Sequence, residues 1–97
     1  MIVALTLFVP LMAAAQVKKV TGVITDETGE PVIGALAKVV GTTLGTATDV
    51  EGRYLIELPA GKDVIEYSYL GYETQTIVIG SNSVMNVKLQ PKSFDID

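Results

Sequence analysis

Five carboxylate residues in two polar segments are the groups of this chain best suited to chemistry. Asp26, Glu27 and Glu30 lie in one segment, and Asp49 and Glu51 lie in the other. If the fold brought the segments together, their oxygens could bind Ca²⁺, or two of them could act as acid and base in glycoside hydrolysis. Neither segment has the Asp-x-Asp-x-Asp-Gly spacing of a calcium loop, and no cleft is indicated. We therefore expect solvated turns, with no metal-binding and no catalytic residue.

The remaining reactive groups also fit no catalytic or phosphate-binding pattern. The chain has no His and no Cys, which excludes Ser-His-Asp and Cys-His catalytic sets, typical zinc sites, haem ligation and disulfides. Nucleophilic catalysis by one of the serines would require a Ser-Lys pair, and the sequence alone identifies no such pair. Residues 41–46 (GTTLGT) are rich in glycine, but no Lys follows the second glycine and no helix is indicated. We predict a protein that is not an enzyme and needs no cofactor.

Three tyrosines, Tyr67, Tyr69 and Tyr72, could form a platform on which sugar rings stack. Side chains alternate across a strand, so Tyr67 and Tyr69 share one face with Ile65. An apolar set of period two is typical of a buried sheet face, and we interpret Tyr67 and Tyr69 as core residues. The position of Tyr72, directly after a glycine, stays open.

The charge pattern argues against nucleic acid as a partner. The chain has 7 Lys and Arg against 11 Asp and Glu, a net charge of −4. Its basic cluster is limited to Lys18 and Lys19, whereas phosphate neutralisation needs a larger positive patch.

The lack of Cys also excludes the lipid-anchored form of bacterial export, which needs a Cys directly after the cleavage point.

The first fifteen residues have the pattern of an export signal. Residues 2–15 are apolar apart from Thr6 and Pro10 and end in three alanines, a small-x-small pattern that signal peptidase accepts. A membrane-spanning helix needs about 20 apolar residues, so this segment is too short to stay as an anchor. No Lys or Arg precedes the run, and we expect the true start codon upstream. The alternative is a buried core strand or helix. We predict a mature chain that begins at Gln16.

From residue 16 onward the pattern is that of short β-strands. Nine glycines separate runs rich in Val, Ile, Thr and Tyr, which favour a pleated, half-buried surface. No apolar period of 3.6 residues persists long enough for a helix. We expect seven strands near residues 19–25, 35–40, 44–48, 53–58, 64–70, 73–79 and 83–89. Their number and spacing predict an all-β fold, a seven-stranded antiparallel sandwich with Greek-key connections.

Alternation within these runs predicts which side chains form the core. An apolar set of period two must be buried on one sheet face. The predicted core residues are Val20, Gly22, Ile24, Ala35, Ala37, Val39, Tyr54, Ile56, Leu58, Met85, Val87 and Leu89. Gly29 and Gly52 stand where tight turns need a positive φ.

Three stretches, in order along the chain, resemble a known family. Residues 20–35 resemble the opening of the carboxypeptidase-regulatory-like domain, whose fold is prealbumin- or transthyretin-like. Residues 41–54 resemble its middle signature, and residues 68–75 (SYLGYETQ) resemble its late one. The amino-acid sequence of these motifs is similar to that at the N-terminus of SusC/RagA-type TonB-linked outer membrane proteins of Bacteroidota.

This resemblance implies a function and a location. It implies a non-catalytic periplasmic accessory or interaction domain of a TonB-dependent outer membrane transporter for glycans or peptides. The implied partners are the plug and barrel of the same parent chain, with the TonB energy-transducing protein and a substrate-binding lipoprotein as further candidates. Contact with the outer membrane would come only through the parent protein. The alternative is the same sandwich as a stabilising or adhesion domain of an exported peptidase or surface protein.

The resemblance also implies domain boundaries. We expect a signal peptide over residues 1–15, the β-sandwich domain over residues 16–91 and a linker over residues 92–97. In the transporters the domain is followed by a TonB box, a plug and a 22-stranded barrel. Residues 93–97 resemble the approach to that box, and no plug or barrel follows in this sequence. We therefore expect either a fragment of a larger reading frame or a solitary accessory domain.

Overall fold

Alternating runs of Val, Ile, Thr and Tyr form seven short strands, as the sequence predicts. A computed structural model describes residues 17–93, and no helix occurs among them. The strands are β1 (Lys18–Thr25), β2 (Leu36–Val39), β3 (Gly45–Ala47), β4 (Arg53–Leu58), β5 (Val64–Ser68), β6 (Gln75–Val78) and β7 (Val87–Lys88). Each lies where a strand is expected, and most are shorter than expected because the ends of the apolar runs turn away from the ladder.

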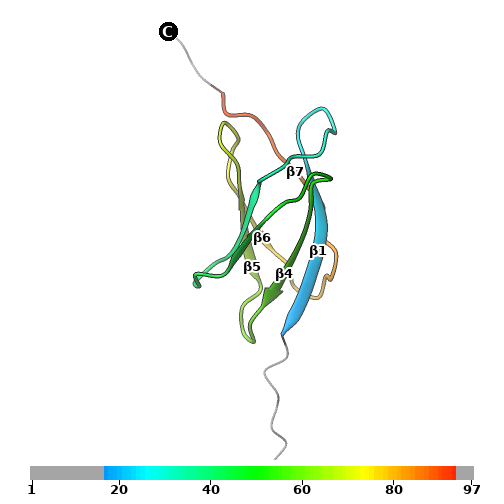
Figure 1. Cartoon of the computed structure of the whole chain (residues 1–97). Coiled ribbons are helices and arrows are strands. Elements are labelled where there is room, and N and C mark those ends of the chain that lie inside the picture. Colours follow the sequence, from blue (N-terminus) through cyan, green and yellow to red (C-terminus); the bar gives the residue numbers. More distant parts are fainter. Residues whose placement is uncertain (1–16, 94–97) are drawn as a thin grey trace, which may run out of the picture.

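The seven strands form two sheets that pack against each other as a sandwich (Figure 1). One sheet has the order β4-β1-β7 and the other has the order β3-β2-β5-β6. Two connections, β2–β3 and β5–β6, are hairpins within one sheet, and the other four cross between the sheets. The predicted seven-stranded all-β sandwich is therefore confirmed. The turn at residues 49–52 joins strands of different sheets and is not a hairpin turn.

One strand pair differs from the antiparallel pattern. β1 pairs antiparallel with β4 from Lys18 to Val23, but its last two residues pair parallel with β7 through Ile24↔Val87 and Thr25↔Lys88. The chain reaches β7 from β6 in the other sheet, and this crossing lets β7 run in the direction of β1. The segment before β7 already follows β1, because Met85 N donates to Thr21 O at 2.8 Å.

The core lies between the two sheets and follows the predicted alternation. Of the predicted core residues, Gly22 and Met85 are partly buried and all the others are buried. The prediction is wrong for Tyr69, which is 38 % exposed, whereas Tyr67 is fully buried. β5 ends at Ser68 and the chain then turns, with Tyr72 N donating to Tyr69 O at 3.0 Å, so the period of two stops before Tyr69.

The described chain enters the sandwich at one end and leaves it at the other (Figure 1). The loops at residues 26–35, 48–52 and 69–74 lie at the end from which the chain leaves, together with residues 89–93. We call this the loop end. The N-terminus of β1 lies at the opposite end, with the loops at residues 40–44, 59–63 and 79–86.

Candidate interaction surface

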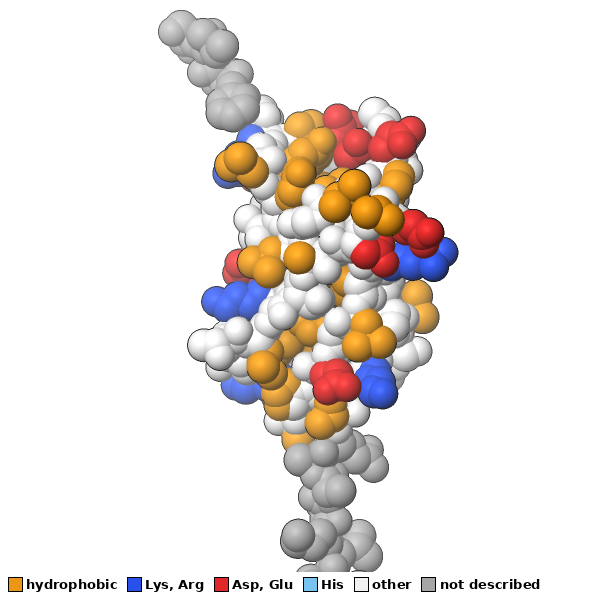
Figure 2. Space-filling view, in the orientation of Figure 1, with side chains coloured by type: hydrophobic (Ala, Val, Ile, Leu, Met, Phe, Trp, Pro, Cys, Tyr) orange, Lys and Arg blue, Asp and Glu red, His pale blue; other side chains and the backbone are white. Residues whose placement is uncertain are grey.

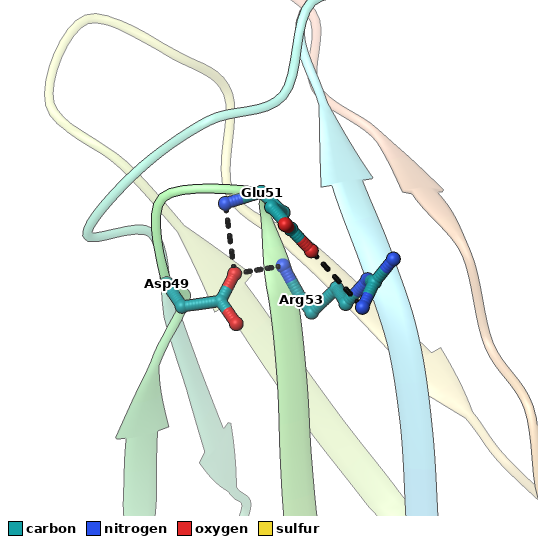
Figure 3. A network of polar contacts seen from close by, with 3 residues as sticks. All are labelled: Asp49, Glu51 and Arg53. Atoms are coloured by element: carbon teal, nitrogen blue, oxygen red, sulfur yellow. Dashed lines mark hydrogen bonds and ion pairs between the residues drawn. The ribbon is translucent and has the colours of Figure 1, made fainter.

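The acidic turn between β3 and β4 uses its first carboxylate to hold its own backbone (Figure 3). The Oδ1 atom of Asp49 accepts the backbone N–H groups of Glu51 and Arg53, both at 2.9 Å. The Glu51 carboxylate forms an ion pair with Arg53 at 3.0 Å, and both side chains are more than half exposed. Exposed ion pairs contribute little stability, so the Asp49 hydrogen bonds are what shape the turn.

The acidic turn between β1 and β2 repeats this arrangement. The Oδ1 atom of Asp26 accepts the backbone N–H groups of Thr28 at 2.9 Å and Glu30 at 3.0 Å, and the Thr28 hydroxyl at 2.7 Å. The Thr28 hydroxyl is the largest cause that lowers the pKa of Asp26, and the backbone N–H groups lower it further. The carboxylate is therefore ionised at neutral pH and serves as an acceptor for the turn.

The two acidic turns lie next to each other but do not build a cation site. Ile24 N donates to Gly52 O at 2.8 Å, which brings the turns together at the loop end. Asp26 and Asp49 nevertheless each direct a carboxylate oxygen at their own turn. Within residues 17–93, no three Asp, Glu, His or Cys side chains are grouped closely enough to hold a metal ion. The described structure thus gives no support to the calcium or glycoside-hydrolysis hypotheses.

The tyrosines form two separate pairs, and neither is a flat platform for a sugar. Tyr54 and Tyr67 lie in the core, where Tyr67 is inaccessible to any ligand. Tyr69 and Tyr72 lie at the loop end, with ring centroids 5.9 Å apart and planes inclined at 42°. Partial desolvation and the nearby Glu27 carboxylate raise the pKa of Tyr72. The sugar-stacking hypothesis therefore finds no continuous aromatic surface among the described residues.

The polar groups of the glycine-rich segment between β2 and β3 form hydrogen bonds within the segment. The Thr42 hydroxyl donates to Val39 O at 2.8 Å and accepts Leu44 N at 3.0 Å. Its polar groups are thus used to close a hairpin loop, as in an ordinary turn.

The edges of the sheets differ in how open they are. β3 lies beside β4 along one side of the sandwich, so each partly shields the other. On the opposite side, the two-residue strand β7 has its Lys88 carbonyl occupied by Gln75 Nε2 at 2.7 Å. β6 is the last strand of its sheet and has β5 as its only ladder partner among the described strands. The sequence predicted a strand here but carried no signal that its outer edge is free.

The fold and these surfaces define a small all-β module whose accessible features are loops and sheet edges. The profile of the CarboxypepD_reg-like domain family matches residues 20–97, and the chain belongs to this family. No helix in the described part of the chain is long and apolar enough to cross a membrane.

Similar proteins point to one group of receptors. The chain is 42 % identical over 79 residues (81 % of its length) to TonB-dependent receptor P39 of Formosa agariphila. It is 40 % identical over 91 residues (94 % of its length) to TonB-dependent receptor SusC of Bacteroides thetaiotaomicron. The chain spans only 8 % and 9 % of the length of these two relatives.

Solved structures support the fold. A chain in the crystal structure of a mutant type II Cohesin-X-Dockerin complex from Acetivibrio cellulolyticus superposes with a TM-score of 0.57 and 24 % identity. The match covers 73 % of this chain and 51 % of that chain. At this identity the match supports the β-sandwich architecture alone.

Proposed function

We propose that this chain is a non-catalytic periplasmic accessory domain of a TonB-dependent outer membrane transporter that imports glycans or peptides. The observation that carries the proposal is the identity of 40–42 % to TonB-dependent receptors over most of the chain. The proposal includes export by a signal peptide at residues 1–15, a sandwich domain at residues 16–91 and a linker at residues 92–97. Residues 1–16 and 94–97 lie outside the described residues.

The geometry of the sandwich suits a module placed in series with other parts. Because the described chain enters at one end and leaves at the other, the loop end would face the region that follows (Figure 1). In the proposed parent protein that region is the plug of the transporter. After removal of the leader, the module would form the N-terminal part of the mature protein, and the chain would reach the following region without doubling back along the sandwich.

The loop end also carries most of the negative charge. Of the nine carboxylates in residues 17–93, six belong to the loops at this end: Asp26, Glu27, Glu30, Asp49, Glu51 and Glu73. Figure 2 shows acidic side chains gathered there. An acidic surface of this kind accelerates encounter with basic segments more than it increases affinity. We therefore propose the plug and the TonB energy-transducing protein as partners, with a substrate-binding lipoprotein as a further one.

A deletion in the parent gene tests this function. Residues 18–90 are removed while the leader and everything encoded after Asp97 are kept. We expect growth that depends on the imported nutrient to fall while the amount of barrel in the outer membrane stays constant. A collapse of barrel abundance would assign the domain to assembly or stability instead, and no change in either quantity would overturn the proposal.

The coding sequence downstream of Asp97 separates the two candidate parents. A TonB box followed by a plug and a barrel is expected. A peptidase domain in its place would favour the alternative, a stabilising or adhesion module of an exported enzyme.

A further inference from the structure

The outer edge of β6 presents unpaired backbone groups. Ile79 N donates to Asp63 O at 2.7 Å, and Ile77 lies opposite Ile65 two residues further along the ladder. Bonded and non-bonded pairs alternate in an antiparallel ladder, so Ile77 bonds to β5 and its two neighbours do not. The backbone N–H and C=O groups of Thr76 and Val78 therefore point away from the sheet. No residue between 17 and 93 pairs with them.

The start of β6 lies beside the segment after β7, since Glu73 N donates to Gln90 O and Gln75 Nε2 donates to Lys88 O, both at 2.7 Å. From Thr76 to Val78 the strand lacks the features that usually protect an edge. The segment Gln75–Val78 contains no Pro and no charged residue, and its register with β5 is continuous, without a bulge. Charges, prolines, bulges and very short strands are the common means of blocking edge pairing. By contrast, β4 carries Arg53 and Glu57 and lies beside β3, while β3 and β7 have three and two residues.

The sandwich is incompletely closed on the inner side of β6. Ile77 points toward the core but is only partly buried. The corresponding residues of β4, Tyr54 and Ile56, are 5 % and 4 % exposed. A further strand beside β6 would cover the exposed part of Ile77, and burial of apolar surface favours such an addition.

An apolar row on the outer face leads to the same edge. Val40 N donates to Val64 O at 2.9 Å, and Val64 lies opposite Val78 in the ladder. Val40, directly after β2, therefore lies beside Val64 of β5, which in turn lies beside Val78 of β6. Val78 ends the row and is 65 % exposed. An apolar side chain on an added strand would extend the row by one position.

Carboxylates lie along this edge, with two lysines near them. Glu66 lies opposite Thr76 on one side and opposite Lys38 on the other. Asp63 bonds to the end of β6 through its carbonyl, and Glu73 precedes the strand by two residues. Lys18 Nζ donates to Gly80 O, two residues after β6. None of the three carboxylates forms an ion pair within the described part of the chain. A basic side chain beside Thr76 would approach Glu66 across the sheet.

We propose that the β6 edge is the docking site for an extended segment of a partner protein, which binds as an added strand. The segment carries an apolar residue beside Val78 and another over Ile77, and it carries Lys or Arg beside Thr76. This is the form of recognition in which backbone hydrogen bonds provide affinity and alternate side chains provide specificity. The proposal rests on the proposed role as an interaction module and specifies the surface that performs it.

A synthetic probe peptide with the sequence Thr-Lys-Val-Val-Val-Lys-Thr tests this site on the purified chain. Its lysines and central valine share one face, as the proposal requires. We expect amide hydrogen exchange at Thr76 and Val78 to slow by about fivefold or more at saturating peptide, since their N–H groups gain partners. Replacement of both lysines by glutamates is expected to weaken binding by about fivefold or more, because a glutamate beside Thr76 would face the Glu66 carboxylate.

A matched pair of variants provides the control. Val78→Lys places a charge on the proposed edge, and Leu55→Lys places the same charge on β4, where Leu55 is 52 % exposed. We expect Val78→Lys to abolish peptide binding and Leu55→Lys to leave it unchanged, with both variants folded by circular dichroism. Unchanged exchange at Thr76 and Val78, or equal effects of the two variants, would overturn the proposal.

Analytical ultracentrifugation of the chain without peptide tests whether a second copy of this chain, and not a partner protein, binds at the β6 edge. A dimer that Val78→Lys abolishes would assign the edge to a second copy of this chain and would overturn the proposal of a partner segment. These measurements do not involve transport. Their failure would leave the deletion phenotype of the parent gene intact, and a failed deletion test would leave peptide binding intact.

Discussion

The hydroxyl oxygens of Tyr54 and Tyr67 lie 2.7 Å apart between the two sheets, where they join β4 to β5. Tyr54 Oη also donates to Met85 O at 2.6 Å, and its single proton is used there, so Tyr67 donates to Tyr54. The rings meet edge to face with centroids 5.6 Å apart. This polar chain therefore links both sheets and the segment before β7 inside an apolar core.

The direction of these hydrogen bonds predicts unequal costs for two similar substitutions. Tyr54→Phe leaves the Tyr67 hydroxyl and the Met85 carbonyl without partners, and we expect it to lower the free energy of unfolding by about 2–3 kcal/mol. Tyr67→Phe removes only the bond donated to Tyr54, and we expect a loss of about 1 kcal/mol. Urea denaturation measures both. Equal costs, or a larger cost for Tyr67→Phe, would contradict the assigned direction.

The same pair predicts sensitivity to alkaline pH. Burial is the main cause that raises the pKa of Tyr54 and of Tyr67 above the ordinary 10.0, and the hydrogen bond to Tyr54 raises that of Tyr67 further. A raised folded-state pKa means that stability is fully present below the unfolded pKa and is lost as pH rises above it. We expect a decline of about 1.4 kcal/mol per pH unit for each of these tyrosines above pH ~10.

Ultraviolet titration of phenolate measures this behaviour. Tyr54 and Tyr67 are expected to ionise only together with unfolding, which circular dichroism follows on the same samples. Ionisation of all four tyrosines near their ordinary pKa in the folded protein would contradict the prediction.

The assignment of sheet faces predicts that buried residues of β4 and β7 are costlier to truncate than the exposed residue of β7. Ile56→Ala and Val87→Ala remove side chains that are 4 % and 3 % exposed, and we expect each to cost about 2–4 kcal/mol through cavity formation. Lys88→Ala changes an exposed side chain on the opposite face and is expected to cost less than about 0.5 kcal/mol. Urea melts that rank these variants in reverse order would show that the faces are exchanged.

The close approach of Gly22 to the segment before β7 predicts a severe effect of one methyl group. A Cβ atom at Gly22 would lie 1.9 Å from Met85 O and 2.9 Å from the Tyr54 ring. Backbone must move to relieve this contact, so we expect Gly22→Ala to cost about 3 kcal/mol or more.

Gly29→Ala is the matched control for Gly22→Ala. A Cβ atom at Gly29 meets nothing within 4 Å, and its φ of +89° makes alanine strained, so we expect a cost of about 1–2 kcal/mol. Thermal or urea melts compare the two variants. A tolerated Gly22→Ala would contradict the parallel packing of β1 against the β7 segment.

The apolar leader predicts processing. We expect the exported protein to begin at Gln16, because the three alanines before it satisfy signal peptidase. Mass spectrometry of the periplasmic and outer membrane fractions measures the N-terminus, and an intact Met1 in those fractions would refute the prediction.

The sequence by itself determined which residues form strands and which side of each strand is buried. Alternation in a pleated strand is a local property, so Val20, Ile24 and Ile56 are assigned to the core without knowledge of their neighbours. The same logic placed Asp26 and Asp49 in turns, because a carboxylate that bonds its own backbone acts within four residues. The prediction failed for Tyr69, where the local pattern continues but the strand has already ended.

Only the tertiary structure decided which strands meet. The parallel pairing of β1 with β7, the crossing of the acidic turns between sheets and the Tyr54–Tyr67 bond all join segments far apart in the chain. A local pattern contains no information on such pairs, because many pairings bury the same alternating faces. The open edge of β6 has the same origin. The residues of Gln75–Val78 predict a strand, but whether a neighbour covers Thr76 and Val78 depends on where every other strand lies.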